Sequence, residues 1–394
     1  MNNRQLFLQH VGQTSEAPLC LNIVKAEGSK MWDAEGKEYI DLIAGISVCN
    51  VGHRHPKVVE AIKKQADEYL HIMVYGELVE NPQVQYATLL AKYLPQHLNA
   101  FFFTASGSEA TEGAMKLAKR YTGRPNIVSF KNSYHGSTQG ALSVMGSEYW
   151  QQAFRPLLPG ITQIEYNSID DLKYITTDTA CVIAETIQAE AGVNLPDSNW
   201  IKSLRKRCDE TGALLILDEI QCGFGRNGTL WAFEQFGIVP DILLLGKALG
   251  GGMPLGAFVS DKKIMDSFTH NPVLGHINTF GGHPVSCAAG LAAFRVLIDD
   301  NIIAEVNKKQ ELFTSLLKHK LIEKINAKGL MIAVYFDSFQ TNKNIIDQLI
   351  ENGVFTDWFL FASNCLRIAP PLNISDDDIV RSCKIILQVL DSVS

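Results

Sequence analysis

The chain has 394 residues, of which 46% are hydrophobic and 20% charged, and it carries a formal net charge of −7. An acidic chain without a basic run is poorly suited to nucleic acid or an anionic membrane surface, so we expect neither as a partner. No run of about 20 apolar residues predicts a membrane span, and the N-terminus lacks the apolar core of a signal peptide. The eight cysteines do not have metal or redox spacing. We therefore expect a cytoplasmic protein with reduced thiols and no metal site.

The N-terminal part is predicted to begin with a β-hairpin. Residues 23–42 have the composition of two strands, with turn-forming residues at 33–36. Pro56 suits the first turn of a helix, and Val58, Ile62 and Ala66 follow it at helical spacing. A helix is therefore expected from residue 56 onward.

Between residues 100 and 260, short apolar runs alternate with amphipathic helical segments. Continuous apolar runs are typical of strands buried on both faces. Their alternation with helices predicts an α/β domain with a largely parallel sheet. The helical segments include 109–121 and 201–212. The predicted strands are 100–105, 126–130, 181–185, 213–218, 241–246 and 257–260.

After about residue 300 the pattern changes to longer helices around a single strand. The sequence predicts helices over 301–319, over 343–353 and from Asp376 onward, and a strand over 331–337. Because one hydrophobic core usually stops growing at about 250–300 residues, we expect two domains. We predict a large α/β domain over 56–304 and a smaller, discontinuous α+β domain formed by 1–55 and 305–394.

A lysine follows the predicted strand 241–246 in the glycine-rich stretch "LLLGKALGGGMPLGA". In an open α/β sheet, ligands bind beyond the carboxyl ends of the strands. A lysine in apolar surroundings loses hydration, which lowers its pKa and makes the neutral amine available as a nucleophile. The alternative is a structural lysine that extends its charge to water at the strand end.

Asp218 ends the predicted strand 213–218. A carboxylate at such a position needs a cationic partner, and a protonated ring nitrogen would serve. The form of this strand also matches a Walker-B aspartate, but that assignment requires a G-x-x-x-x-G-K-[ST] loop. The only Gly-Lys pair in this region, Gly246-Lys247, is followed by Ala248, so we set the nucleotide-binding alternative aside.

Two further segments contain residues that could bind a ligand. Ser106-Gly107-Ser108 precedes a predicted helix, whose free N–H groups can bind an anion, although Ser106 and Glu109 could form only a capping box. Tyr134 and His135 stand before a glycine, where an aromatic ring could stack on a planar ligand or simply belong to the core. An anion cradle, a stacking ring, a carboxylate for a ring nitrogen and a nucleophilic lysine together indicate a pyridoxal-phosphate site.

The sequence resembles the class III pyridoxal-phosphate aminotransferases, the ornithine, acetylornithine and 4-aminobutyrate group, over nearly its whole length. The resemblance implies a fold-type-I, two-domain α/β protein that is a homodimer with shared active sites. It also implies ping-pong transfer of an amino group from an ω-amine or amino acid to a 2-oxo acid such as 2-oxoglutarate or pyruvate. An aminomutase or decarboxylase of the same fold and a non-catalytic cofactor-binding protein are the alternatives. The matching blocks are 31–56, 104–124, 134–136, 184–193, 214–257, 276–290 and 366–372.

The resemblance also implies roles for individual residues. Lys247 corresponds to the lysine that forms an imine with the cofactor and then moves the substrate proton, and Asp218 corresponds to the partner of the pyridinium nitrogen. Gln221 corresponds to the donor to the phenolic oxygen, and Thr279 to a residue that reaches the phosphate from the other subunit. The remaining cofactor-binding positions are Gly107 and Ser108 at the phosphate, Tyr134 on the ring, His135, Glu185 and Gln188.

Substrate binding is implied for Glu190 and Arg367, which resemble a pair that gates carboxylate binding. The chain departs from the family at Ser137, where ornithine and acetylornithine enzymes usually have an arginine that binds a substrate carboxylate. We therefore expect ornithine and acetylornithine to be slow donors. Thr186 and Ala189 also replace a usual proline and glycine, while the polar positions around them are kept. Three histidines in family-like turns, His53, His55 and His283, are expected to be structural.

Overall fold

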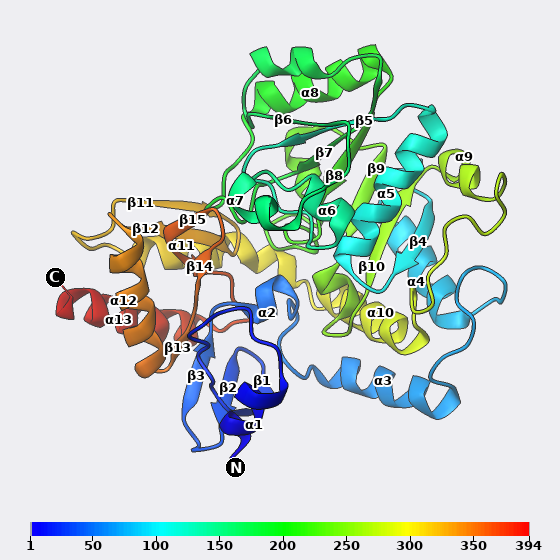
Figure 1. The fold of residues 1–394 in the computed structure, drawn as a ribbon. Coiled ribbons are helices and arrows are strands. Elements are labelled where there is room, and N and C mark those ends of the chain that lie inside the picture. The colour runs from blue at the N-terminus through cyan, green and yellow to red at the C-terminus, as the bar shows by residue number, and fades with distance from the viewer. Residues whose placement is uncertain (1, 394) are drawn as a thin grey trace.

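A seven-stranded sheet forms the centre of the protein (Figure 1). The computed structural model describes residues 2–393, and the sheet has the strand order β4-β10-β9-β8-β7-β5-β6. Strands β5 to β9 run parallel to one another, and only β10 pairs antiparallel, with β4 and β9. The strands are β4 (Ala100–Thr104), β5 (Asn126–Phe130), β6 (Ile161–Ile164), β7 (Thr179–Glu185), β8 (Leu214–Asp218), β9 (Ile242–Leu245) and β10 (Gly256–Ser260).

All six strands predicted between residues 100 and 260 are confirmed, as is the largely parallel sheet. The sequence did not reveal β6. This strand lies at the edge of the sheet and is only four residues long, with Thr162 and Gln163 in its middle. A short edge strand that is partly exposed needs no apolar run, so it lacks the signal that identified the others.

The sheet is buried on both faces, as its apolar runs predicted. On one face, Leu215 and Leu217 of β8 pack in a core with Trp200 of helix α8 (Ser198–Thr211). On the other face, Ile216 packs in a second core with Ala114 of helix α5 (Gly107–Thr122). Every side chain of β8 is therefore buried, and only the strand ends are left for chemistry.

Two four-stranded sheets lie to one side of the central sheet (Figure 1), and one of them joins N-terminal strands to a strand of the C-terminal part. The predicted N-terminal hairpin is present, and its strand β3 pairs in parallel with β13 from the C-terminal part, with Ile40 opposite Val354. One sheet has the order β1-β2-β3-β13 and the other β11-β12-β15-β14. Their strands are β1 (Ile23–Glu27), β2 (Lys30–Asp33), β3 (Glu38–Asp41), β11 (Lys324–Lys328), β12 (Met331–Tyr335), β13 (Val354–Phe355), β14 (Trp358–Phe359) and β15 (Ala362–Ile368).

The helices pack around these sheets. The helix predicted from residue 56 is α3 (Pro56–Glu68), and it lies against α10 (Pro284–Asp299). Among residues 2–393, no helix is both long and apolar enough to cross a membrane. The other α-helices are α1 (Asn3–His10), α2 (Ala44–Ser47), α4 (Asn81–Ala91), α6 (Gln139–Ser143), α7 (Glu148–Gln151), α9 (Lys262–Met265), α11 (Val306–Leu316), α12 (Phe339–Glu351) and α13 (Asp376–Ser392). Short 3₁₀ segments are η1 (Gln152–Phe154), η2 (Asp170–Tyr174), η3 (Ala232–Phe236), η4 (Lys247–Gly250), η5 (Asp266–Phe268) and η6 (Ile302–Glu305).

Candidate active site

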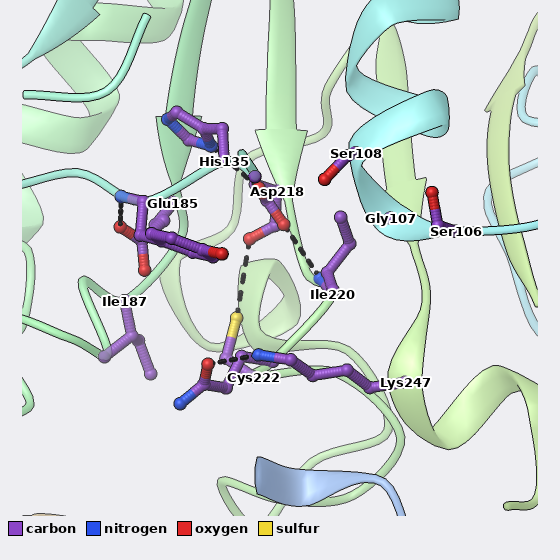
Figure 2. A pocket seen from close by; sticks show the side chains of 13 residues that line it. Ser106, Gly107, Ser108, His135, Glu185, Ile187, Asp218, Ile220, Cys222 and Lys247 are labelled. Atoms are coloured by element: carbon purple, nitrogen blue, oxygen red, sulfur yellow. Dashed lines mark hydrogen bonds and ion pairs between the residues drawn. The ribbon is translucent and has the colours of Figure 1, made fainter. Parts of the chain in front are cut away.

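A pocket of about 190 Å³ opens at the carboxyl ends of β7 and β8, beside the first turn of α5 (Figure 2). This is the edge of a parallel sheet where ligands are expected. In Figure 2 the Lys247 side chain extends across the lower part of the pocket, with Asp218 above it. The pocket is lined by Ser106, Gly107, Ser108, Tyr134, His135, Gly136, Glu185, Ile187, Asp218, Ile220, Gln221, Cys222 and Lys247.

Asp218 is the last residue of β8, and its side chain is held in one orientation. Its Oδ1 accepts a hydrogen bond from the backbone N–H of Ile220 at 2.9 Å, and its Oδ2 lies 2.7 Å from Nδ1 of His135. Both side chains are almost fully buried. Within the described residues, Nε2 of His135 has no hydrogen-bond partner. The buried carboxylate is therefore fixed by neighbours and available to a cationic group of a ligand.

Lys247 follows β9 through Gly246 and begins the 3₁₀ segment η4. Its φ of +47° is unusual for a residue with a side chain. Its Nζ donates to Oε1 of Gln221. Burial lowers the pKa of Lys247, although the nearby Glu190 carboxylate acts in the other direction. The amine is thus available in its neutral form more readily than that of an exposed lysine.

The start of α5 combines a helix cap with an open set of backbone donors. Ser106 is the N-cap, and its Oγ accepts from the N–H of Glu109 at 3.2 Å. The capping box is only half formed, because the Glu109 carboxylate accepts from the N–H of Ala105 at 3.0 Å and not from that of Ser106. The N–H groups of the first helical turn have no acceptor within the helix and can bind an anion. Gly136 lies close to this turn: a Cβ on it would be 2.2 Å from Oγ of Ser108, and its φ is +123°. A glycine is required here, as expected of a tight anion cradle.

Glu185 ends β7 and lies beside Asp218 in the strand register. Its two carboxyl oxygens accept from the N–H groups of Tyr134 and Ala189, both at 2.9 Å. Burial and the neighbouring Asp218 charge raise the pKa of Glu185 to about 8. Glu185 therefore places Tyr134 over the pocket without adding a full negative charge near neutral pH.

A second polar group adjoins the pocket through Gln221. Arg367 donates to both carboxyl oxygens of Glu190, at 2.8 Å each, and both side chains are about 95% buried. Gln221 Nε2 also donates to Glu190 Oε1 at 3.2 Å, and the N–H of Leu360 donates to Oε2 at 3.1 Å. Burial alone would raise the pKa of Glu190, but Arg367 lowers it to about 2. A chain of contacts thus connects Lys247, Gln221, Glu190 and Arg367.

Most of the residues singled out from the sequence meet in this region, but five do not line the pocket. Glu190 and Arg367 only adjoin it through Gln221. Thr279 is exposed on a loop, and Ser137 is exposed at the rim, 3.1 Å from the Tyr134 hydroxyl. Gln188 is buried and instead binds the backbone of Lys131 and the side chain of Asn194. The pocket residues that the sequence analysis did not single out are Gly136, Ile187, Ile220 and Cys222. The last two flank Gln221, so their proximity to the strand end was the only available signal.

The histidines also have identifiable surroundings. His53 Nε2 lies 2.6 Å from the Asp41 carboxylate, which fits the structural role expected of it. His55 and His283 each have a buried Nδ1 without a partner among the described residues. Across residues 2–393, no group of three or more His, Cys, Asp or Glu side chains is arranged to hold a metal ion.

These residues fit pyridoxal phosphate. A flat ring with a protonated nitrogen needs a buried, oriented carboxylate, which Asp218 supplies. A phosphate needs free backbone donors with space around them, and the Cβ that Gly136 lacks would fill that space. A carbonyl carbon needs a lysine that can lose its proton, and Lys247 reaches into the same pocket. The donor set is therefore complete for the ring, the phosphate and the carbonyl of this cofactor.

Comparison with known proteins agrees with this fit. The family model for Aminotransferase class-III matches residues 11–390. The acetylornithine aminotransferase of Methanopyrus kandleri is 37% identical over 97% of both chains, and the [LysW]-aminoadipate semialdehyde/glutamate semialdehyde transaminase of Sulfurisphaera tokodaii is 39% identical over 80% of this chain and 81% of its own. The solved acetylornithine aminotransferase of Elizabethkingia anophelis has a TM-score of 0.86 and 31% identity, with 98% of both chains covered.

A second solved structure, the ornithine aminotransferase of Toxoplasma gondii with partial occupancy of PLP at its active site, has a TM-score of 0.91 and 29% identity. It covers 99% of this chain, and the alignment includes 93% of its own. The chain belongs to the class III aminotransferases. It is a pyridoxal-phosphate-dependent ω-aminotransferase of fold type I, with a small-molecule amino donor and a 2-oxo acid as its substrates. The resemblance seen in the sequence is thereby confirmed.

Proposed function

We propose that the pocket around Lys247 and Asp218 is the catalytic site, in which some residues bind the cofactor and others bind the substrate. The observation that carries this proposal is the meeting of a desolvated lysine, a fixed buried carboxylate and a glycine-bounded anion cradle in one cavity. When bound, pyridoxal phosphate supplies the electron sink that makes removal of a substrate C–H proton feasible.

Each residue then has one task. Gly107 and Ser108 bind the phosphate through their backbone donors, and Tyr134 covers the ring. Asp218, oriented by His135, would hold the ring nitrogen through its carboxylate. Lys247 would hold the carbonyl carbon of the cofactor through Nζ, and the same Nζ is the proposed base that moves a proton at the substrate carbon. Gln221, which accepts a hydrogen bond from Nζ of Lys247, would donate to the phenolic oxygen.

Arg367 and Glu190 form the proposed carboxylate gate. In the closed state Glu190 occupies all the donors that a substrate carboxylate could use: Arg367, Gln221 Nε2 and the N–H of Leu360. When 2-oxoglutarate or glutamate enters, its own carboxylate takes this place and Glu190 turns away. An ω-amine donor has no carboxylate near the reacting carbon, so the gate stays closed. One site thereby serves two substrate shapes.

The donor class follows from Ser137. Relatives named acetylornithine aminotransferases are 35–40% identical to this chain, yet the rim position next to Tyr134 lacks an arginine. We propose that the preferred donor is an ω-amine without a carboxylate at its far end, and that ornithine and acetylornithine react slowly.

An amino-donor panel tests this proposal, with the loss of cofactor absorbance in single-turnover reactions as the readout. The panel compares acetylornithine, ornithine and simple ω-amines on the wild type and on Ser137→Arg. The variant should gain rate with acetylornithine, while Ser315→Arg, which adds the same charge on exposed α11, should not. A wild type that uses acetylornithine best would contradict the proposed donor class.

We further propose that the protein is a homodimer in which Thr279 completes the partner's site. Two segments, 70–79 and 273–280, present an apolar surface, with Val79 92% and Val273 73% exposed. The segments touch through His71 and Phe280, whose ring centroids are 5.0 Å apart. Sedimentation should show a dimer that Val273→Glu dissociates and that Val380→Glu, an exposed position on α13, leaves intact. A wild-type monomer with full activity would contradict this.

We also propose a division into two domains and a cellular location. The seven-stranded sheet and its helices support a large domain over 56–304, and the two four-stranded sheets support a small domain formed by 1–55 and 305–394. Limited proteolysis at the boundary should release these units. All eight cysteines are free in the structure, which suits a reducing compartment, so we place the protein in the cytoplasm.

A further inference from the structure

Arg367 has a second carboxylate partner that the gate does not use. The Oδ1 atom of Asp357 lies 2.8 Å from Nε of Arg367. Glu190 occupies a different edge of the guanidinium, the one formed by the two terminal nitrogens. The side chain of Asp357 is 33% exposed, whereas that of Arg367 is only 4% exposed. Arg367 therefore lies between two carboxylates. Glu190 also contacts Gln221 and so belongs to the chain of contacts that leads to Lys247, whereas Asp357 does not.

The same turn holds Arg367 in three further ways. The carbonyl of Trp358 accepts from its NH2 group at 3.0 Å, and the ring of Phe359 lies 4.5 Å from its guanidinium carbon. The backbone N–H of Arg367 donates to the carbonyl of Asp357 at 3.0 Å. These contacts come from Asp357, in the connection between β13 and β14, and from the two residues of β14, and none of them involves Glu190. They remain when Glu190 turns away.

We propose that Asp357 is a positioning residue that keeps the Arg367 guanidinium charge-balanced and oriented while a substrate carboxylate replaces Glu190. This inference rests on the proposed gate. Between the departure of Glu190 and the arrival of the substrate, a buried guanidinium without an anion would be strongly unfavourable. Asp357 removes that penalty, because one carboxylate stays on Nε throughout the exchange.

The role predicts an effect on rate rather than on affinity. Asp357 repels Glu190 in the closed state and the substrate carboxylate in the open state, and both occupy the same edge of Arg367. These two repulsions largely cancel in the overall equilibrium. The state between them, in which the edge is empty, has no such compensation. Loss of the Asp357 charge should therefore slow entry and exit of a carboxylate together and leave the dissociation constant nearly unchanged.

The test uses glutarate, a dicarboxylate without an amino or oxo group, so that binding occurs without turnover. The holoenzyme is studied at pH 8, above the pKa of Asp357, which burial raises to about 6 against the opposing effect of Arg367. Calorimetry gives the dissociation constant, and stopped-flow absorbance of the bound cofactor, with tryptophan fluorescence as a second signal, gives the rates. In Asp357→Asn, both rates should fall about tenfold or more, while the dissociation constant changes less than about threefold.

Asp357→Glu keeps the charge and should recover much of the lost rate. The matched control is Asp209→Asn. Its partner Arg205, in the middle of α8, also has two carboxylate partners, Asp209 at 2.7 Å and Asp241 at 2.8 Å. This control should bind glutarate at wild-type rates. Unchanged rates in Asp357→Asn, or a changed dissociation constant without slower exchange, would overturn the inference. Arg367→Gln distinguishes the two proposals: if it binds glutarate like the wild type, the gate itself is wrong.

Discussion

Glu185 and Asp218 end neighbouring parallel strands and are register partners, so two buried carboxyl groups lie side by side in the pocket. Two neighbouring carboxylates that are both ionised would be strongly unfavourable in a buried site. The structure resolves the conflict by surrounding Asp218 with His135 and a backbone donor, and by raising the pKa of Glu185 to about 8. Near neutral pH, Glu185 therefore holds a proton, while Asp218 keeps the two hydrogen-bond partners that orient it.

This asymmetry predicts different outcomes for two neutral, isosteric substitutions. Asp218→Asn removes the charge that faces the ring nitrogen, and removal of such an electrostatic partner should slow single-turnover transamination by about 100-fold or more. Glu185→Gln replaces a group that is already neutral at pH 7 and should cost less than about tenfold, mainly through one lost backbone hydrogen bond. Both variants should still bind cofactor. Equal losses in the two variants would contradict the assignment of the charge to Asp218.

Lys247→Ala should abolish covalent attachment of the cofactor while the protein still folds, because the lysine contributes little to either core. After borohydride reduction and denaturation, mass spectrometry should find the cofactor on the wild-type chain and not on the variant. Lys309→Ala is the matched control, since burial also lowers the pKa of Lys309, which instead donates to a backbone carbonyl at 2.7 Å. A reducible cofactor that remained on Lys247→Ala would refute the role of this lysine.

Gly136→Ala should weaken cofactor binding. The new Cβ would overlap Ser108 in the anion cradle, and the φ of +123° disfavours any side chain. We expect a dissociation constant for pyridoxal phosphate at least about tenfold higher, equivalent to 1.4 kcal/mol, measured by equilibrium dialysis. Gly36→Ala serves as the control, because its φ is also positive, at +84°, but its Cβ would meet no described atom within 4 Å. If both variants retained wild-type affinity, the cradle would lie elsewhere.

The sequence predicted the central sheet well because most of its inner strands consist mainly of consecutive apolar residues. Lys247 and Asp218 could be located because both follow such runs directly, so strand ends identified the edge of the sheet. The anion cradle was only partly predictable. Ser106 to Ser108 appeared as a helix start, but nothing in the sequence indicated that Gly136 approaches Ser108 across the pocket.

Contacts between distant segments were least predictable. Glu190 and Arg367 are 177 positions apart, and their pairing was expected only from the family resemblance. No role for Asp357 could be predicted from the sequence, because an aspartate in an irregular segment is usually solvated. Its proximity to Arg367 depends on the tight connection between β13 and β14 and on the pairing of β14 with β15.

The Asp41–His53 pair predicts a dependence of stability on pH. Burial alone would lower the pKa of His53, but hydrogen bonds to Asp41 and Cys49 have a larger effect in the opposite direction. The pKa of His53 is therefore raised to about 10. A pKa above the unfolded value of about 6.5 means that protonated His53 stabilises the fold fully below pH 6.5 and that this stabilisation is lost as pH rises toward 10. His53→Gln should therefore lower the Tm most at pH 6 and least at pH 10. His319→Gln is the control, because its partner Asp391 is 77% exposed, whereas Asp41 is buried. A Tm difference that grew with pH would contradict this.

Arg367→Ala should separate the two halves of the reaction. The half-reaction with glutamate or 2-oxoglutarate needs the arginine to bind the substrate carboxylate, and loss of a bidentate, charge-assisted pair should lower its kcat/KM by about 100-fold or more. The half-reaction with an ω-amine uses no such contact and should change less than about tenfold. Arg205→Ala, which removes another partly buried arginine with two carboxylate partners, should affect neither half. Stopped-flow measurement of each half-reaction decides the matter. Equal losses in both halves would mean that Arg367 only supports the fold around Glu190, and that the carboxylate of the substrate binds to a different cation.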